Sequence, residues 1–454
     1  MNPILTKLTF VMVLTALVAS PRSPATTPED SLKTRQQAVT QQIDANLEQL
    51  AELYKHLHRH PELSYQEAAT AGKLAQEMRA IGFEVTTGVG GHGLVCVFRN
   101  GPGKTIMVRT DLDGLPVTEK TGLPYASRVV ARGRDGLPVG VMHACGHDMH
   151  MTCWVGTARV LAALKDHWKG TLVFIGQPAE EVGAGARMML EAGLFQRFPK
   201  PDYALALHCD SQQKAGTVAF TKGLAMANVD TVDVLVKGKG GHGAAPHTTV
   251  DPVVLAAKMI LDFQTIVSRE LDPVEPAVVT VGSIHGGSKH NIIPSEVRLQ
   301  LTVRSTTDEV RNKILNAIQR IAKGNAEAAR APQPEVSINQ SEFTPALIND
   351  AKLTDRLTDL FRFVLGKENV LERPLSLGGE DFARYGREGV PIFMYFLGTI
   401  DDERWAAAKK PGGEPLPSMH SERFYPVIPP TIRTGVLTMS LAVWDLLGTQ
   451  DAPR

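Results

Sequence analysis

Hydrophobic and polar positions along the chain predict short strands that take turns with amphipathic helices. Apolar runs predict strands at 93–99, 104–114, 171–176 and 202–208. Amphipathic stretches predict helices at 31–58, 66–80, 148–165 and 184–192. This alternation indicates an α/β fold with a mostly parallel central sheet flanked by helices. Polar stretches follow or close three of the strands, "RTDLD", "GQPAEE" and "LHCD", and in such sheets ligands bind at the carboxyl ends of strands.

A different pattern begins near residue 221. "NVDTVDVLVKG" alternates like a half-exposed strand, and a helix follows with Asp251 as its N-cap and Pro252 at its first position. Two strands, a helix over 307–329 and the strand "PEVSIN" complete the order β-α-β-β-α-β, which predicts a ferredoxin-like α+β domain. We therefore expect a discontinuous catalytic domain, residues 31–220 and 341–450, interrupted by a lid or dimerisation domain over 221–340.

The first 25 residues have the pattern of a secretory signal peptide. Lys7 precedes the apolar run "LTFVMVLTALVA", and small and polar residues follow. The run is short for a membrane span, which disfavours an uncleaved anchor. We expect an exported protein, periplasmic or secreted, that is free of the membrane once the signal is cleaved.

Composition narrows the class of ligand. The 454 residues include 48 Lys and Arg against 48 Asp and Glu, so no basic surface for nucleic acid is indicated and a small-molecule substrate is expected. The cysteines are too few for a disulfide framework, and the sequence does not predict their pairing. They are Cys96, Cys145, Cys153 and Cys209.

"HACGHDMHM", residues 143–151, concentrates groups that bind metals. Cys145 and His147 are two residues apart in a loop that opens a helix, so one ion could take both side chains. Cys145 could equally be a buried structural thiol or a nucleophile. In "GQPAEE", one of Glu180 and Glu181 could bind a metal while the other acts as a general base, although acidic pairs are also common on surfaces.

Other candidates are weaker when taken singly. His208 ends an apolar strand, and His420 lies in the polar loop "MHSERF". Asp113, like Asp111 in the same stretch, could orient a ligand imidazole or simply brace a turn.

Further candidates lie in and after the insert. His242 lies in the Gly-rich "GKGGHGAAPH", where an ordinary turn is the alternative. Asn291 and Arg304 together suit a substrate carboxylate, although surface placement is as plausible for the arginine. Gly378, in "GGEDFARYG", would allow close backbone approach of a substrate, but a plain helix start with acidic residues explains this stretch almost as well.

The whole set of stretches resembles one family. They are, in chain order from about residue 56 to about 421, "HRHPELSYQE", "RTDLDGLPV", "VMHACGHDMH", "GQPAEE", "ALH", "GKGGHGAAPH", "NIIP", "GGEDFA" and "MHS". The chain resembles the co-catalytic metal amidohydrolases of the aminoacylase and carboxypeptidase clan. Within it, the chain is most similar to the branch of hippurate hydrolases, N-acyl amino acid hydrolases and plant auxin-conjugate hydrolases.

The resemblance implies two divalent metal ions per subunit, Zn²⁺ or Mn²⁺ first, Co²⁺ or Ni²⁺ as alternatives. The implied ligands, with the first as the bridge, are Cys145, His147, Glu181, His208 and His420. Glu180 would be the general base that activates water, and His242 would help to stabilise the oxyanion. Asn291 would lie on the carboxylate side of the substrate, and Asp113 would be a supporting aspartate.

The implied reaction is hydrolysis of the amide bond of N-acyl amino acids or short peptide conjugates. Dipeptide hydrolysis at the same site, a cysteine-nucleophile hydrolase and a non-catalytic binding protein are the alternatives. A homodimer or higher homo-oligomer is also expected.

Three stretches depart from the family: "LHCDSQQ" lacks a proline often found there, and segment 128–140 and "DDERWAAAKKPGGEPLPS" are longer than usual. The two long segments are expected to border the substrate cleft.

Overall fold

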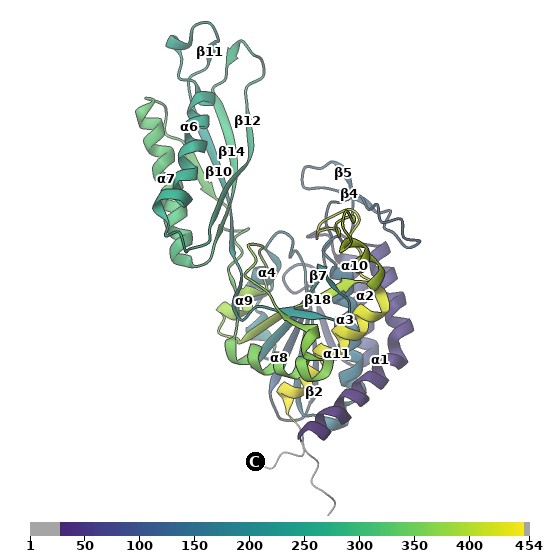
Figure 1. The fold of residues 1–454 in the computed structure, drawn as a ribbon. Helices are drawn as coiled ribbons and strands as arrows, with labels where there is room; N and C mark the ends of the chain where they lie inside the picture. Colours follow the sequence, from purple (N-terminus) through teal and green to yellow (C-terminus); the bar gives the residue numbers. More distant parts are fainter. Residues whose placement is uncertain (1–27, 449–454) are drawn as a thin grey trace, which may run out of the picture.

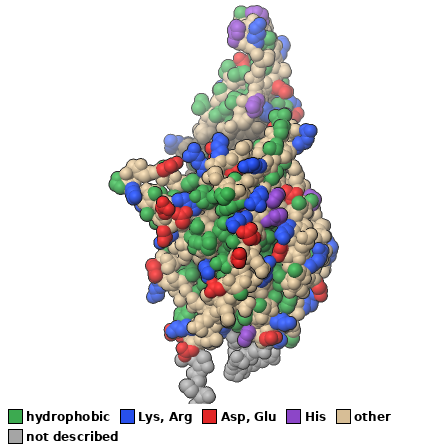
Figure 2. All heavy atoms as spheres, turned by 90° about the vertical axis from the view of Figure 1, so that its right-hand side faces the viewer, with side chains coloured by type: hydrophobic (Ala, Val, Ile, Leu, Met, Phe, Trp, Pro, Cys, Tyr) green, Lys and Arg blue, Asp and Glu red, His purple; other side chains and the backbone are tan. Residues whose placement is uncertain are grey.

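The computed structural model describes residues 28–448, and it places a large α/β domain beneath a narrow projecting lid (Figures 1 and 2). The predicted signal peptide lies outside the described residues. Within residues 28–448, no helix is long and apolar enough to cross a membrane. The α/β fold with an inserted lid confirms the predicted fold class.

The α/β domain is built on one eight-stranded sheet. In spatial order its strands are β1 (Glu84–Thr87), β2 (Leu94–Asn100), β6 (Gly170–Gln177), β3 (Thr105–Asp111), β7 (Tyr203–Lys214), β18 (Ile392–Ile400), β8 (Val218–Phe220) and β17 (Val370–Glu372). The central strands β6, β3, β7 and β18 are parallel, as predicted. The sheet is mixed outside this centre, because β1, β2 and β8 pair antiparallel with neighbours. For β1 and β2, the short connection between them requires antiparallel pairing, because parallel neighbours need a long crossover.

Two helical layers bury the faces of this sheet. One layer comprises α1 (Pro28–Arg59), α2 (Ala68–Ile81), α3 (His147–Ala163), α8 (Ala351–Leu365) and α11 (Ile428–Leu447). The other contains α4 (Gly185–Glu191), α5 (Leu194–Arg197) and α9 (Ala383–Arg387). Successive strand residues face opposite layers, as in β3, where Met107 packs with one layer and Val108 with the other. Burial of both faces explains the nearly continuous apolar character of these strands.

The lid is a separate four-stranded antiparallel sheet covered by two helices (Figure 1). Its elements are β10 (Asn228–Lys237), α6 (Pro252–Thr265), β12 (Val278–Gly286), β14 (Glu296–Ser305), α7 (Asp308–Ala328) and β15 (Glu335–Ile338). The spatial order β12-β14-β10-β15 is that of a ferredoxin-like domain. Asp251 caps α6 as predicted, because its carboxylate accepts from Val253 N at 2.8 Å.

Smaller elements complete the chain. A two-stranded ribbon, β11 (Gly241–His242) and β13 (Ile292–Ile293), extends the lid at its free end (Figure 1). Strands β9 (Gly223–Met226) and β16 (Leu347–Asn349) pair where the chain enters and leaves the lid. A small hairpin within the long segment 128–140 is formed by β4 (Val130–Arg132) and β5 (Pro138–Gly140). A short helix, α10 (Asp402–Ala408), lies in the long segment before His420.

Candidate active site

The carboxyl ends of β3 and β6 and the start of α3 bring the predicted ligands together. Asp111 ends β3, Glu180 and Glu181 follow β6, and Cys145 and His147 open α3. His208 differs from these residues, because it does not end its strand as the sequence predicted. β7 instead continues to Lys214, because its outer part still pairs with β18.

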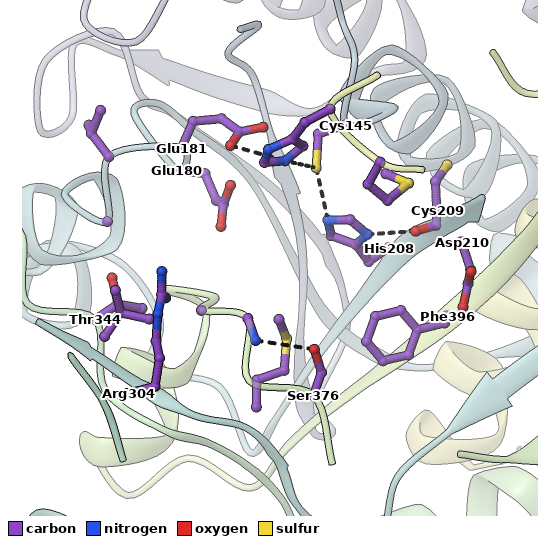
Figure 3. A pocket seen from close by; sticks show the side chains of 18 of the residues that line it. Cys145, Glu180, Glu181, His208, Cys209, Asp210, Arg304, Thr344, Ser376 and Phe396 are labelled. Carbon is purple, nitrogen blue, oxygen red and sulfur yellow. Dashed lines mark hydrogen bonds and ion pairs between the residues drawn. The ribbon is translucent and has the colours of Figure 1, made fainter. Parts of the chain in front are cut away.

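Five side chains converge on a small volume, four of them buried or half-buried behind the exposed His420. Figure 3 labels three of the five, Cys145, Glu181 and His208. Cys145 Sγ lies 3.3 Å from His420 Nε2 and 3.5 Å from His208 Nε2. Glu181 Oε2 lies 3.6 Å from His420 Nε2, and Glu181 Oε1 lies 3.7 Å from His147 Nε2. His420 is in a left-handed conformation, φ 65°, and its side chain is 54% exposed, so this ligand closes the site from the solvent side.

These residues fit two divalent cations. The ligand atoms form two triplets, Cys145–His147–His208 and Cys145–Glu181–His420, each within 4.8 Å, and the thiol belongs to both. His147 Nε2 and Glu181 Oε1 are buried without a hydrogen-bond partner, which is costly unless something else binds them. Sulfur, imidazole and carboxylate ligands suit Zn²⁺ and neighbouring transition metals. The donor set therefore matches the predicted bridge at Cys145.

The electrostatics of the site also favour bound cations. Burial raises the pKa of Glu181 to about 7, and burial together with Glu181 and Glu180 raises the pKa of Cys145 well above its usual range. Burial lowers the pKa of His147, but Asp111 and other carboxylates outweigh it and raise it to about 10. A reactive cysteine needs a lowered pKa, so the chain's own residues do not make Cys145 a free nucleophile. A bound cation would reverse this balance and deprotonate the thiol.

Asp113, which the resemblance implied as a supporting aspartate, lies behind the carboxylate pair. Its carboxylate accepts from Glu180 N at 3.2 Å and from Glu181 N at 3.1 Å, and its backbone oxygen accepts from His147 Nδ1 at 2.8 Å. One residue therefore orients both the carboxylate pair and a ligand imidazole. The Glu180 side chain is not bonded to Asp113 and lines the cavity beside the ligands (Figure 3).

The cavity beside the ligands has a volume of about 450 Å³. Arg304, from the base of the lid, and Gly378, from the "GGED" stretch, both line it; both were predicted to bind substrate. In Figure 3, Arg304 and Thr344 lie on one side, and His208 and Phe396 lie on the other. Burial lowers the pKa of Arg304, whose guanidinium stays charged and faces a cavity of substrate size.

Two predicted residues are not brought to this cavity. His242 lies on β11 and Asn291 directly precedes β13, at the free end of the lid where Figure 2 shows histidine side chains, and neither residue lines the cavity. His242 Nδ1 accepts only from Ala244 N, at 3.0 Å. The long lid strands hold the ribbon away from the α/β domain, so the predicted oxyanion and carboxylate contacts do not form within this chain.

The extended segments border the site only indirectly. The hairpin β4–β5 does not line the cavity, but Arg134 at its turn pairs with Glu342, a cavity residue, at 3.0 Å. No residue of segment 401–418 lines the cavity, but Met419, which follows it directly, does.

A buried charge cluster beneath the site was not predicted. Arg109 contacts Glu380 at 2.8 Å, Asp381 at 3.2 Å and Asp111 at 2.8 Å, and all four side chains are buried. The acidic residues of "GGEDFA" therefore neutralise Arg109, which corrects the interpretation of this stretch as a plain helix start. The available clue was an arginine inside the apolar strand "IMVRTD", because a buried cation requires a paired anion.

The fold and the paired ligand sets define the class of the protein: metal-dependent hydrolases with an inserted lid. The chain belongs to the peptidase family M20/M25/M40, whose model matches residues 107–411. It is 36% identical to Thermostable carboxypeptidase 2 of Saccharolobus solfataricus over 359 residues, 78% of this chain and 87% of that one. It is 35% identical to N-acetyl-L-cysteine deacetylase of Bacillus subtilis over 381 residues, 84% of this chain and 87% of that one.

Solved structures agree with this placement. A protein described as an aminohydrolase from methicillin-resistant Staphylococcus aureus superposes with a TM-score of 0.78 at 31% identity, over 91% of this chain and all of that one. A dinuclear metal-binding peptidase of the M20 family from Bacillus subtilis superposes with a TM-score of 0.69 at 28% identity, over 89% and 99% of the two chains. The protein is therefore a metallo-amidohydrolase or peptidase by family.

Proposed function

We propose that the protein hydrolyses the amide bond of an N-acyl amino acid or a short peptide conjugate, with Glu180 as general base. The observation that carries the proposal is the pair of triplets that share Cys145, four of whose five residues line the same cavity as Glu180. Zn²⁺ and Mn²⁺ are the proposed native ions, with Co²⁺ and Ni²⁺ as alternatives. When bound there, two such ions would polarise the amide carbonyl and make water more acidic.

The residues of the chain supply the proton transfers and the orientation of the substrate. Burial and the nearby Glu380 raise the pKa of Glu180 well above its usual range. Bound cations would favour its carboxylate form, which could then accept a proton from water. It would then donate that proton to the leaving amine. Arg304 would bind the carboxylate of the amino acid, which places the amide between the lid base and the ligands. Apolar side chains of Met226 and Phe396 would contact the acyl group.

Substitution of the base tests the proposal. Glu180→Gln is expected to keep both metals and to lose about 10²-fold or more of kcat, because general-base catalysis contributes this much. Cys145→Ala is the contrasting variant, because it should lose metal as well as activity. Activity is measured on benzoyl, indole-acetyl, acetyl and fatty-acyl amino acids and on dipeptides, and metal content by mass spectrometry. Near-normal turnover in Glu180→Gln would refute the role of Glu180.

Metal removal is a separate test. Exhaustive chelation is expected to abolish activity, and Zn²⁺, Mn²⁺ or Co²⁺ should restore it. Full activity in the chelated protein would refute metal-dependent hydrolysis. Hydrolysis of dipeptides but not of N-acyl amino acids would instead favour the peptidase alternative.

We also propose a homodimer and export from the cytoplasm. His242 and Asn291 can meet a cavity only if the lid moves far or if they serve a second copy. The lid leaves β12 as an edge strand with Ile284 half exposed, which offers a surface for pairing. Light scattering of the purified protein tests the dimer. The intact mass of protein expressed with its native N-terminus tests cleavage near residue 25.

A further inference from the structure

Glu67 ends the stretch "HRHPELSYQE", and none of the catalytic steps proposed above uses its carboxylate. The side chain is fully buried between the loop before α2 and the turn after β6. One oxygen, Oε1, accepts two backbone hydrogen bonds, from Tyr65 N at 2.9 Å and from Ala179 N at 2.8 Å. A single buried acceptor therefore joins two segments that are 112 residues apart.

Both backbone donors belong to residues in the left-handed conformation. Tyr65 has a φ of 69° and Ala179 a φ of 50°, and neither is glycine. A residue with a Cβ avoids this region, and it stays there only where its surroundings impose the conformation. Within residues 28–448, four non-glycine residues have a positive φ, and Glu67 is bonded to two of them. The hydrogen bonds to Oε1 constrain both donors on their N–H side. On its other side, the Ala179 carbonyl accepts from Ala184 N at 3.1 Å and from Gly185 N at 3.2 Å.

The Ala179 turn directly sets the catalytic pair. The next two backbone N–H groups, of Glu180 and Glu181, donate to Asp113. Three consecutive N–H groups thus end on two buried carboxylates, Glu67 and Asp113. Ser64 Oγ, from the loop that contains Glu67, also donates to Asp113 at 2.6 Å. The loop before α2 therefore contacts both carboxylates that hold the turn: it supplies Glu67, and it donates a hydrogen bond to Asp113.

We propose that Glu67 is a positioning residue for the general base: by accepting the Ala179 N–H it holds the left-handed turn that directs Glu180 into the cavity. The proposal rests on the assignment of Glu180 made above. The turn requires an acceptor oxygen at the distance from the backbone that a glutamate side chain reaches. A negative charge is not required, because Oε2 is buried without a partner, and burial and then Asp113 raise the pKa of Glu67 to about 7.

Two substitutions separate placement from charge. Glu67→Gln keeps the acceptor oxygen at the same reach and removes the charge, whereas Glu67→Asp keeps the charge and withdraws the oxygen by one methylene. Because a displacement of about 1 Å in a catalytic group costs up to about 10²-fold in rate, we expect Glu67→Asp to lower kcat about tenfold or more. Glu67→Gln should stay within about threefold of the parent, since its acceptor is in place. KM and metal content, by mass spectrometry, should be unchanged in both.

Glu62 provides a matched control in the same loop. Its carboxylate accepts from Ala69 N at 3.1 Å and Thr70 N at 2.7 Å and does not contact the Ala179 turn. Glu62→Asp is therefore expected to lower the melting temperature, through a weaker start of α2, without changing kcat.

Three results would overturn the positioning role. These are equal losses of kcat in Glu62→Asp and Glu67→Asp, a loss in Glu67→Gln as large as in Glu67→Asp, or a loss of metal that matches the loss of activity. Glu67→Gln keeps the test decisive if Glu67→Asp does not fold, because its activity alone decides whether charge is needed. An active Glu180→Gln would refute the base itself. An inactive Glu180→Gln with a normal Glu67→Asp would refute only the role of Glu67.

Discussion

At the scale of the residue, backbone carbonyls orient the two imidazoles that face the shared thiol. His147 Nδ1 donates to Asp113 O, and His208 Nδ1 donates to Cys209 O at 2.7 Å. Both rings therefore present Nε2 to the metal side. Hydrogen bonds within the chain itself hold each ring in this orientation. Preorganised ligands of this kind favour tight and geometrically specific binding.

Substrate recognition at Arg304 gives the first residue-scale prediction. Arg304→Gln is expected to raise KM about 10- to 100-fold with a smaller change in kcat, because a hydrogen bond to a charged group contributes about 1.5–3 kcal/mol. Steady-state kinetics on an N-acyl amino acid, and on the same compound with its carboxylate replaced by an amide, measure this. Arg298→Gln is the control, because Arg298 lies on the same strand outside the cavity. Equal KM increases on both compounds would contradict carboxylate recognition.

Spacing alone indicated a possible metal site at Cys145 and His147. The choice of Glu181 over Glu180, and of His420, came only from the resemblance to the family. Arg109 and Glu67 are harder to interpret, since a charged residue inside an apolar run or a loop looks the same whether its partner is near or far in sequence. Their partners lie in segments that only the folded chain brings together.

At the scale of the element, the turn that begins α3 depends on Gly146. It has a φ of 82°, and a Cβ there would lie 2.9 Å from both Cβ and Sγ of Cys209. Gly146→Ala is therefore expected to cost about 2 kcal/mol or more of the free energy of unfolding. Because Gly146 separates Cys145 from His147, metal content should fall too. Chemical unfolding and metal analysis measure the two effects.

Gly324 is the matched control for that substitution. It lies on the exposed side of α7 with a helical φ, and a Cβ there would meet nothing within 4 Å. Gly324→Ala should raise the free energy of unfolding by up to about 1 kcal/mol, since alanine favours a helix interior. If Gly146→Ala and Gly324→Ala changed the free energy of unfolding alike, the left-handed conformation of Gly146 would not make alanine costly there.

A buried network joins α1 to the start of α3 and predicts a pH dependence of stability. His58 contacts Asp148 at 2.6 Å and Glu119 at 3.1 Å. Burial lowers the pKa of His58, but these two partners outweigh it and raise it to about 9. The folded pKa exceeds the unfolded value near 6.5, so this stabilisation is complete below about pH 6.5 and is lost as pH rises through about 9.

His58→Gln tests this network. The melting temperature of the parent protein should exceed that of His58→Gln most near pH 6, and the difference should shrink towards about pH 9.5. The partner carboxylates have lowered pKa values, so their contribution is lost in the opposite direction, as pH falls below about 4. Thermal unfolding of the metal-loaded protein across this range measures the difference. A difference independent of pH would show that His58 is not charged in the folded state.

At the scale of the whole molecule, the α/β domain and the lid could be predicted from the sequence to different extents. The lid order was predictable because strict alternation in β10 and β14 marks a sheet with one buried face. The antiparallel edges of the large sheet were not, since a short apolar run does not reveal the direction of its neighbour. The position of the lid relative to the cavity also depends on the fold, and it leaves His242 far from the residues it was expected to assist.

Complementation between two inactive chains tests whether His242 serves a second copy. If the protein is a dimer in which each lid reaches the partner's cavity, a mixed dimer of His242→Ala and Glu180→Gln holds one intact site. Random exchange at equal amounts should then restore about a quarter of the parental activity, because half of the dimers are mixed and each has one working site of two. Glu180→Gln mixed with Cys145→Ala is the control. Those two defects lie in the same cavity, so one site of the mixed dimer lacks the base and the other lacks the bridge. Mixed dimers that form without recovery in the first pair would contradict service to a second copy. Full activity of His242→Ala on its own would place His242 outside the reaction.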